Sequence, residues 1–187
     1  MSNIEAVIKL AQVVFWLSAV PVGAFGVWKY FHESKERRTW EKARLAKELL
    51  DDLDKNAFAL NATYMLGGWL GRWYERQGNG QVDRFQVTHR QISEVLDLRR
   101  TPMTRNETYV RECFDNFLFH LELCFSAVER KLIDWDALEP MLIPLFAGVN
   151  RELVMPSLMA YATFNGYHRT RTRLPELFEA ALTKPAR

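Results

Sequence analysis

A run of nineteen residues without a formal charge, Leu10 to Trp28, lies between Lys9 and Lys29. At a rise of about 1.5 Å per residue, a helix of this length matches the thickness of the hydrocarbon core of a bilayer. We therefore expect residues 1–32 to form an N-terminal transmembrane anchor.

Two other interpretations of this run fit the residues less well. A signal peptide begins with a strongly basic segment, whereas Glu5 stands in the segment here and no convincing small-residue cleavage site follows the run. A core helix in a domain of this size is rarely apolar on every side. The membrane span is the preferred interpretation.

Basic residues are denser after the run than before it. Lys29, Lys35, Arg37 and Arg38 follow it within ten residues, whereas Lys9 is the single basic residue before it. Because basic residues mark the cytoplasmic side of a span, we expect a single-pass protein with its N-terminus outside. The rest of the chain would then be cytoplasmic, and membrane lipid is the first expected partner.

Small residues and one proline stand inside the run: Ser18, Ala19, Pro21, Gly23 and Gly26. The spacing of Ala19 and Gly23 lets two helix backbones approach closely, which predicts association between spans and a homo-oligomer. Pro21 removes one backbone donor and should kink the helix or be relieved by a neighbouring one. Small residues and proline are also common in membrane helices without such a role, and this alternative stays open.

Charge and cysteine content exclude several classes of function. The 25 basic and 23 acidic residues are interspersed and give a net charge of +2, which argues against wholesale binding of nucleic acid. Cys113 and Cys124 lie eleven residues apart in one predicted helix, too far to form a disulfide. No Cys-x-x-Cys pair or close histidine set is present, so we expect no metal and no cofactor. No small-molecule substrate is evident.

Helical periodicity dominates the chain, and the expected fold class is all-α, because no segment alternates like a strand. The membrane helix should continue as a stalk over residues 33–53 and lead into a bundle over residues 57–187, which together form one domain, 33–187. Within the bundle we expect helices over 57–75 and 88–98, a loop at 76–81, and the longest helix from 106 or 108 to 132. Asp134, Pro156 and Pro175 are expected to start three further helices.

Arg84 and His89 are separated by four residues, the spacing used by ribonucleases of the HEPN class. In these all-helical domains, Arg and His from two protomers cleave RNA. The residue types suit that chemistry, because histidine exchanges protons and arginine steadies the phosphate. Chance pairing is the preferred interpretation, since the motif is short and arginine is frequent in this chain.

The longest predicted helix carries a second polar group: Arg111, Asp115, Asn116, His120 and Glu122. Asn116 and His120 face the same way, whereas Arg111 points elsewhere, so these residues do not form one site on a single helix. A buried network through Arg111, Asp115, Asn116 and Glu122, joining this helix to its neighbours, is the preferred interpretation. If His120 lies in an open cleft instead, it is the best general-base candidate in the chain.

A basic stretch stands between two predicted helices: His168, Arg169, Arg171 and Arg173. Its charge predicts binding of an anionic ligand, such as an RNA phosphate, a nucleotide signal or an anionic lipid. A solvated loop whose arginines balance Glu176 and Glu179 by local charge is the slightly preferred interpretation.

Two resemblances concern the whole layout. The helix 111–133, with Phe114-Asp115-Asn116-Phe117, Glu122 and Lys131-Leu132-Ile133-Asp134, resembles the second half of the DUF4760-type family of single-pass bacterial membrane proteins. A span, a charged helix containing Arg37-Arg38-Thr39-Trp40 and a helical core are similar in plan to the HEPN-like membrane accessory proteins of type VI-B CRISPR systems.

The resemblances imply an antiviral defence effector at the bacterial inner membrane that oligomerises and forms a pore or depolarises the membrane. They also imply RNA or a CRISPR effector complex as a further partner. The preferred hypothesis is this non-enzymatic membrane effector. The alternatives are a membrane-tethered, metal-independent HEPN-like ribonuclease and a passive anchor that recruits a partner.

Overall fold

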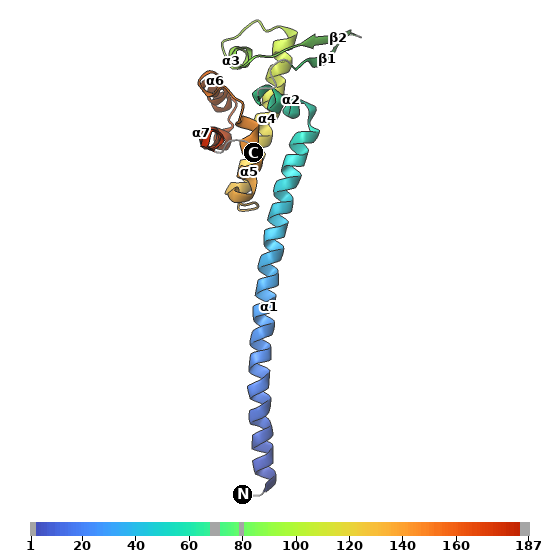
Figure 1. Cartoon of the computed structure of the whole chain (residues 1–187), viewed down its shortest axis with the longest axis vertical. Coiled ribbons are helices and arrows are strands. Elements are labelled where there is room, and N and C mark those ends of the chain that lie inside the picture. Colours follow the sequence, from blue (N-terminus) through green and yellow to red (C-terminus); the bar gives the residue numbers. More distant parts are fainter. Residues whose placement is uncertain (1–2, 68–71, 79–80, 184–187) are drawn as a thin grey trace. The chain divides into compact units, whose positions relative to one another are not determined.

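The computed structural model describes residues 3–67, 72–78 and 81–183, with side chains over 28–67, 72–76 and 83–183. It divides into two compact units, Met1–Lys42 and Ala43–Arg187. Helix α1 (Asn3–Lys55) is one continuous helix that contributes to both units (Figure 1). Helices make up most of the described residues, and the prediction of an all-α fold is confirmed.

The first unit consists of the N-terminal part of α1. Among the residues whose side chains are described, no helix is both long enough and apolar enough to cross a membrane. The predicted span, 10–28, lies outside those residues except for Trp28. The same holds for the predicted packing residues of the span: Ser18, Ala19, Pro21, Gly23 and Gly26.

Over the residues that the structure describes, the second unit contains the C-terminal end of α1, six further helices and one hairpin of two strands. The elements are α2 (Ala57–Leu66), β1 (Tyr74–Gly78), β2 (Gln81–Phe85), α3 (His89–Leu96), α4 (Arg105–Glu129), α5 (Trp135–Phe146), α6 (Arg151–Phe164) and α7 (His168–Thr183).

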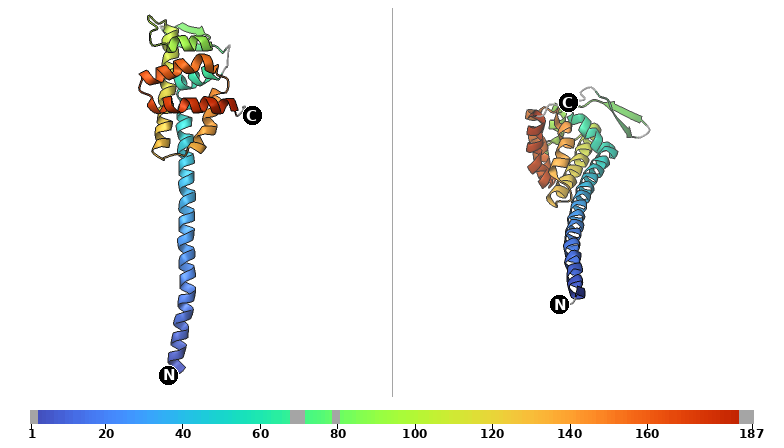
Figure 2. Two further views of the ribbon diagram at one scale, coloured as in Figure 1. Left: turned by 90° about the vertical axis from the view of Figure 1, so that its left-hand side faces the viewer. Right: turned by 60° about the horizontal axis from the view of Figure 1, so that its bottom comes forward.

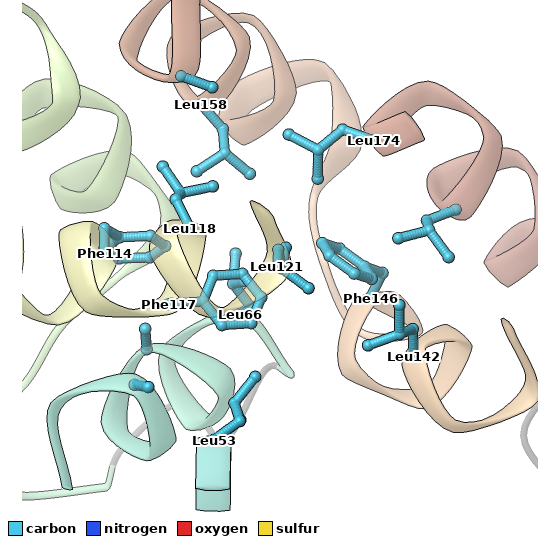
Figure 3. Packing of buried hydrophobic residues seen from close by; sticks show 14 of the residues in the cluster. Leu53, Leu66, Phe114, Phe117, Leu118, Leu121, Leu142, Phe146, Leu158 and Leu174 are labelled. Carbon is cyan, nitrogen blue, oxygen red and sulfur yellow. The ribbon is translucent and has the colours of Figure 1, made fainter. Parts of the chain in front are cut away.

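Helix α4 is the centre of the hydrophobic core. Its apolar residues recur at intervals of three and four, and this face is fully buried at Phe114, Phe117 and Leu121. Leu53 of α1, Leu66 of α2 and further residues of α5, α6 and α7 surround it (Figure 3). Cys113 and Cys124 are free thiols buried in the same helix, and burial raises the pKa of each to about 12.

Three shorter helices pack in a row, with α6 between α3 and α7. In the left view of Figure 2, α6 and α7 run across the direction of α4. The chain turns from α6 into α7 at Gly166, whose φ of +76° is a conformation that glycine adopts without steric cost. This turn places the first residues of α7 beside α4.

Side-chain caps determine where several of these helices begin. Thr88 and Thr104 each form a reciprocal capping box, with Gln91 in α3 and Glu107 in α4. The side chains of Asn56 and Asn150 cap α2 and α6. The predicted starts of α3 and α4 agree with these caps to within a few residues.

The structure corrects the prediction for residues 57–85. The helix expected over 57–75 ends at Leu66, and the backbone N–H of the C-cap residue Gly67 donates to the carbonyl oxygen of Thr63. The loop expected at 76–81 overlaps an antiparallel hairpin of β1 and β2. Cross-strand pairs stabilise the hairpin: the rings of Tyr74 and Phe85 lie 6.0 Å apart, and Arg76 pairs with Asp83 at 2.8 Å.

Two prolines lie inside helices that they were expected to start. Pro156 is within α6, which begins at Arg151, and Pro175 is within α7, which begins at His168. The basic stretch 168–173 therefore belongs to the first turns of α7 and is not a loop between helices. Asp134 does occupy the N-cap position of α5.

Candidate functional site

Arg84 and His89 bind different partners in this structure. Arg84 lies exposed on β2, where its Nε donates to Glu75 on β1 at 2.8 Å. His89 is buried: the backbone N–H of Asn150 donates to its Nδ1 at 3.4 Å, and its Nε2 lies 3.3 Å from the carbonyl oxygen of Leu66. Because Nδ1 accepts, Nε2 must carry the proton and donate to Leu66. The ring thereby joins α3 to the end of α2 and the start of α6.

His120 is half-buried and bonded to the junction between α1 and α2. The Nδ2 of Asn56 donates to the Oδ1 of Asn116 at 3.0 Å and lies 3.4 Å from the Nε2 of His120. Since an amide nitrogen only donates, Nε2 of His120 must accept. Burial lowers the pKa of His120, although Asp52 opposes this effect, so the ring suits a neutral acceptor.

Arg111 caps the C-terminal end of α3. Its Nη2 donates to the carbonyl oxygen of Val95 at 2.6 Å and to that of Asp97 at 3.0 Å, and its Nε also donates to Val95. A cation at this end of a helix satisfies free carbonyl groups and opposes the negative end of the helix dipole.

Asp115 connects α4 to α6. The hydroxyl of Tyr161 donates to the Oδ1 of Asp115 at 2.8 Å, and the hydroxyl of Tyr167 donates to its backbone oxygen at 3.4 Å. Burial raises the pKa of Asp115, although the bond from Tyr161 and the charge of Arg111 oppose this rise. Burial and the Asp115 carboxylate together also raise the pKa of Tyr161.

Glu122 caps the N-terminal end of α7. Its Oε2 accepts from the backbone N–H of Thr170 at 2.8 Å and from the Thr170 hydroxyl at 2.9 Å, and its Oε1 accepts from Arg169. Burial alone would raise the pKa of Glu122, but these hydrogen bonds outweigh it and hold the pKa below its ordinary value. The positive end of the helix dipole also stabilises a carboxylate at this end of a helix.

The polar residues of α4 therefore bond to different neighbours and do not converge on one cleft. The α4 polar residues, as we call this set, are Arg111, Asp115, Asn116, His120 and Glu122. They reach α3, α6, the α1–α2 junction and α7. Sequence reasoning selected these residues but missed Asn56, Tyr161 and Thr170, their partners. For Asn56 a signal was available, because an asparagine directly before a helical pattern is typical of an N-cap residue.

The basic residues of α7 lie on different sides of that helix. A pocket of about 440 Å³ between α4 and α7 is lined by His168, Arg169 and Arg173, with Phe125 and Glu129 opposite. Residues two apart in a helix point to nearly opposite sides, so Arg171 cannot line the same surface as Arg169 and Arg173. The four predicted residues are thus not brought together.

The two arginines of this pocket already have acidic or aromatic partners. Arg169 forms ion pairs with Glu122 and Glu129, and Arg173 forms one with Glu176 at 2.6 Å. The guanidinium of Arg173 also lies 5.1 Å from the ring centroid of Trp135. Anionic ligands would have to compete with these carboxylates.

Large aromatic side chains are exposed along α1 from the last residue of the uncharged run onward. Trp28, Tyr30, Phe31 and Trp40 are between 60 and 77% exposed. Basic residues stand between these rings. Residues one turn apart form ion pairs along this segment, for example Lys29 with Glu33 and Arg37 with Glu41.

Over the described parts of the chain, no three His, Cys, Asp or Glu residues gather as a metal site would require. Comparison of the chain with protein-family models, with curated proteins and with solved structures finds no match.

Proposed function

We propose that this chain is a single-pass membrane protein that acts by assembling with copies of itself in the bilayer, as a non-enzymatic effector. The observation that carries the proposal is the segment directly after the uncharged run. There, exposed aromatic rings and basic side chains follow residues 10–28 on one continuous helix. Aromatic rings and bases in this order are typical of the cytoplasmic end of a membrane helix.

The positions of the titratable residues support a non-enzymatic role. Both ring nitrogens of His89 bond to backbone groups, and the accepting nitrogen of His120 faces Asn56. A general base needs a free nitrogen near the proton that it removes. A ribonuclease based on Arg84 and His89 would first have to break the bonds of His89 to α2 and α6.

The small residues of the run support assembly between spans. In the sequence, Ala19 and Gly23 have the spacing at which membrane helices approach closely. Assembly through this face, with opening of a pore or loss of membrane potential, is the mechanism that we propose. The resemblance to DUF4760-type proteins and to the CRISPR accessory proteins favours a role in antiviral defence at the bacterial inner membrane.

Membrane potential in cells that express the chain tests this mechanism. Cells with the unaltered chain should depolarise, and the double variant Ala19→Leu/Gly23→Leu should abolish most of this effect because leucine separates the backbones. The matched control is Val14→Leu/Ala24→Leu, which helical periodicity puts on the other side of the span. The control should depolarise the cells at equal protein level in the membrane fraction.

Undiminished depolarisation by Ala19→Leu/Gly23→Leu would contradict packing through these residues. Cleavage of RNA by the purified full chain, lost in His89→Ala or His120→Ala, would favour the tethered ribonuclease instead. Recovery of the chain in a soluble fraction would contradict the anchor itself. Crosslinking to a different protein, with no depolarisation, would support a passive anchor.

A further inference from the structure

Charges are divided unequally between the two sides of α1 over residues 28–42. With about 3.6 residues per turn, successive spacings of three and four put a set of residues on one side. These residues form what we call the basic face: Trp28, Phe31, Lys35, Arg38 and Lys42. Glu33 and Glu36 lie on the other side of the helix, and Glu41, three residues after Arg38, borders the basic face but pairs with Arg37.

The carboxylates outside the basic face have basic partners one turn away on the same part of the helix. Lys29 pairs with Glu33 at 3.6 Å, and Arg37 pairs with Glu41 at 2.9 Å. His32 lies 3.8 Å from Glu36 and completes the pattern of partners one turn apart. These carboxylates are therefore engaged away from the basic face.

Lys35 and Arg38 are the two exposed cations of the basic face. Neither has an acidic partner among the residues that the structure describes. Phe31, 67% exposed, lies one turn before Lys35 on the same face. The face thus offers two free positive charges beside an exposed ring, a combination that complements an anionic group at an apolar boundary.

We propose that the basic face binds the phosphate groups of anionic phospholipids through Lys35 and Arg38. This inference rests on the proposed function, in which residues 10–28 occupy the bilayer. Lys35 then lies about 10 Å and Arg38 about 15 Å beyond Trp28 along the helix. The headgroup layer extends roughly 5–7 Å from the hydrocarbon core, and long basic side chains reach back toward it.

Phe31 and Trp28 favour a lipid partner over a nucleic acid. Both rings lie at the end of the basic face next to the uncharged run, where the interface between headgroups and hydrocarbon would be. Lys42, about 21 Å beyond Trp28, is too far along the helix to reach the headgroups. RNA binding would need the rings free for stacking, which a surrounding bilayer prevents.

Lipid selectivity of the full chain in proteoliposomes tests this proposal. Electron paramagnetic resonance measures the fraction of spin-labelled phosphatidylglycerol and of spin-labelled phosphatidylcholine that the protein immobilises. The unaltered chain should prefer phosphatidylglycerol severalfold, and salt at about 1 M should weaken the preference because it screens charges beyond about 3 Å. Lys35→Gln/Arg38→Gln should remove most of the preference.

The matched control removes two charges from the other side of the same helix. Lys29→Gln/Arg37→Gln changes the net charge equally, but its two basic residues pair with Glu33 and Glu41. It should keep the preference. Equal loss of preference in both double variants, or none in either, would overturn the lipid site while leaving the anchor intact.

Two further outcomes separate the lipid site from the proposed function. Absence of any immobilised lipid with the unaltered chain would overturn the anchor and the lipid site together. RNA binding that depends on Lys35 and Arg38, without preference between the two lipids, would assign the basic face to nucleic acid and overturn the lipid site alone.

Discussion

Glu107 shows how one side chain both starts the central helix and makes it sensitive to acid. Its Oε2 accepts from the backbone N–H of Thr104 at 2.7 Å, and Arg100 donates to its Oε1. These bonds, with the Thr104 backbone first, lower the pKa of Glu107 to about 2. A lowered folded-state pKa contributes stability that is fully present above the ordinary value of 4.5 and is lost as the pH falls toward 2.

We expect Glu107→Gln to lower the free energy of unfolding by about 1 kcal/mol near neutral pH, because the neutral amide bonds Thr104 and Arg100 more weakly. The difference from the unaltered protein should shrink as the pH falls toward 2, where Glu107 itself becomes protonated. Denaturant unfolding across this pH range measures the difference in stability and its dependence on pH. Glu112→Gln, at an exposed position of α4, is the control, and a difference independent of pH would contradict the account.

His89 illustrates a histidine whose role is structural. Replacing it by alanine leaves the carbonyl of Leu66 and the N–H of Asn150 without their side-chain partner. We expect His89→Ala to destabilise the bundle by about 1–3 kcal/mol in denaturant unfolding. His168→Ala removes an exposed ring and should change the stability by less than about 0.5 kcal/mol. Equal stability of the two variants would show that the bonds of His89 contribute little.

At the scale of elements, α4 caps two other helices at opposite ends. Arg111 bonds to the C-terminal carbonyl groups of α3, and Glu122 bonds to the N-terminal groups of α7. We expect Arg111→Met to speed amide hydrogen exchange in α3 and leave α7 unchanged. Glu122→Gln should speed exchange in the first turns of α7 and leave α3 unchanged. Loosening of both helices by either variant would mean that the caps act through the whole bundle.

Sequence periodicity predicted the helices better than the contacts between them. The buried face of α4 follows directly from the spacing of Phe114, Phe117 and Leu121, because one helix face is encoded by local residues. The targets of its polar residues were not predictable in this way. Glu122 and Thr170, for example, are 48 residues apart and meet only through the packing of α7.

The hairpin was missed because its strands are polar. The strand Tyr74–Gly78 contains Glu75, Arg76 and Gln77, so it lacks the alternation of apolar residues that indicates a half-buried strand. The Asn79-Gly80 pair in the sequence was the available signal, since this dipeptide is frequent in two-residue hairpin turns.

The starts of α6 and α7 were also predicted incorrectly, because Pro156 and Pro175 were expected in first turns and lie further inside their helices.

At the scale of the whole molecule, the candidate catalytic and binding residues of the sequence do not come together in one site. The α4 polar residues bond to neighbouring elements, and the basic residues of α7 pair with carboxylates or lie on different sides of their helix. On α1, beside the uncharged run, the exposed ring of Phe31 lies one turn from Lys35, and neither Lys35 nor Arg38 has an acidic partner among the described residues. We therefore propose assembly at a membrane as the function of this chain.

The mass of the complex extracted from membranes in mild detergent tests this assignment most directly. Native mass spectrometry should show a defined assembly whose protein mass is a multiple of 21.9 kDa, with more than one copy of the chain. Ala19→Leu/Gly23→Leu should shift the population toward single chains. A strict monomer of 21.9 kDa at every protein concentration would contradict the central claim that this protein acts as a homo-oligomer.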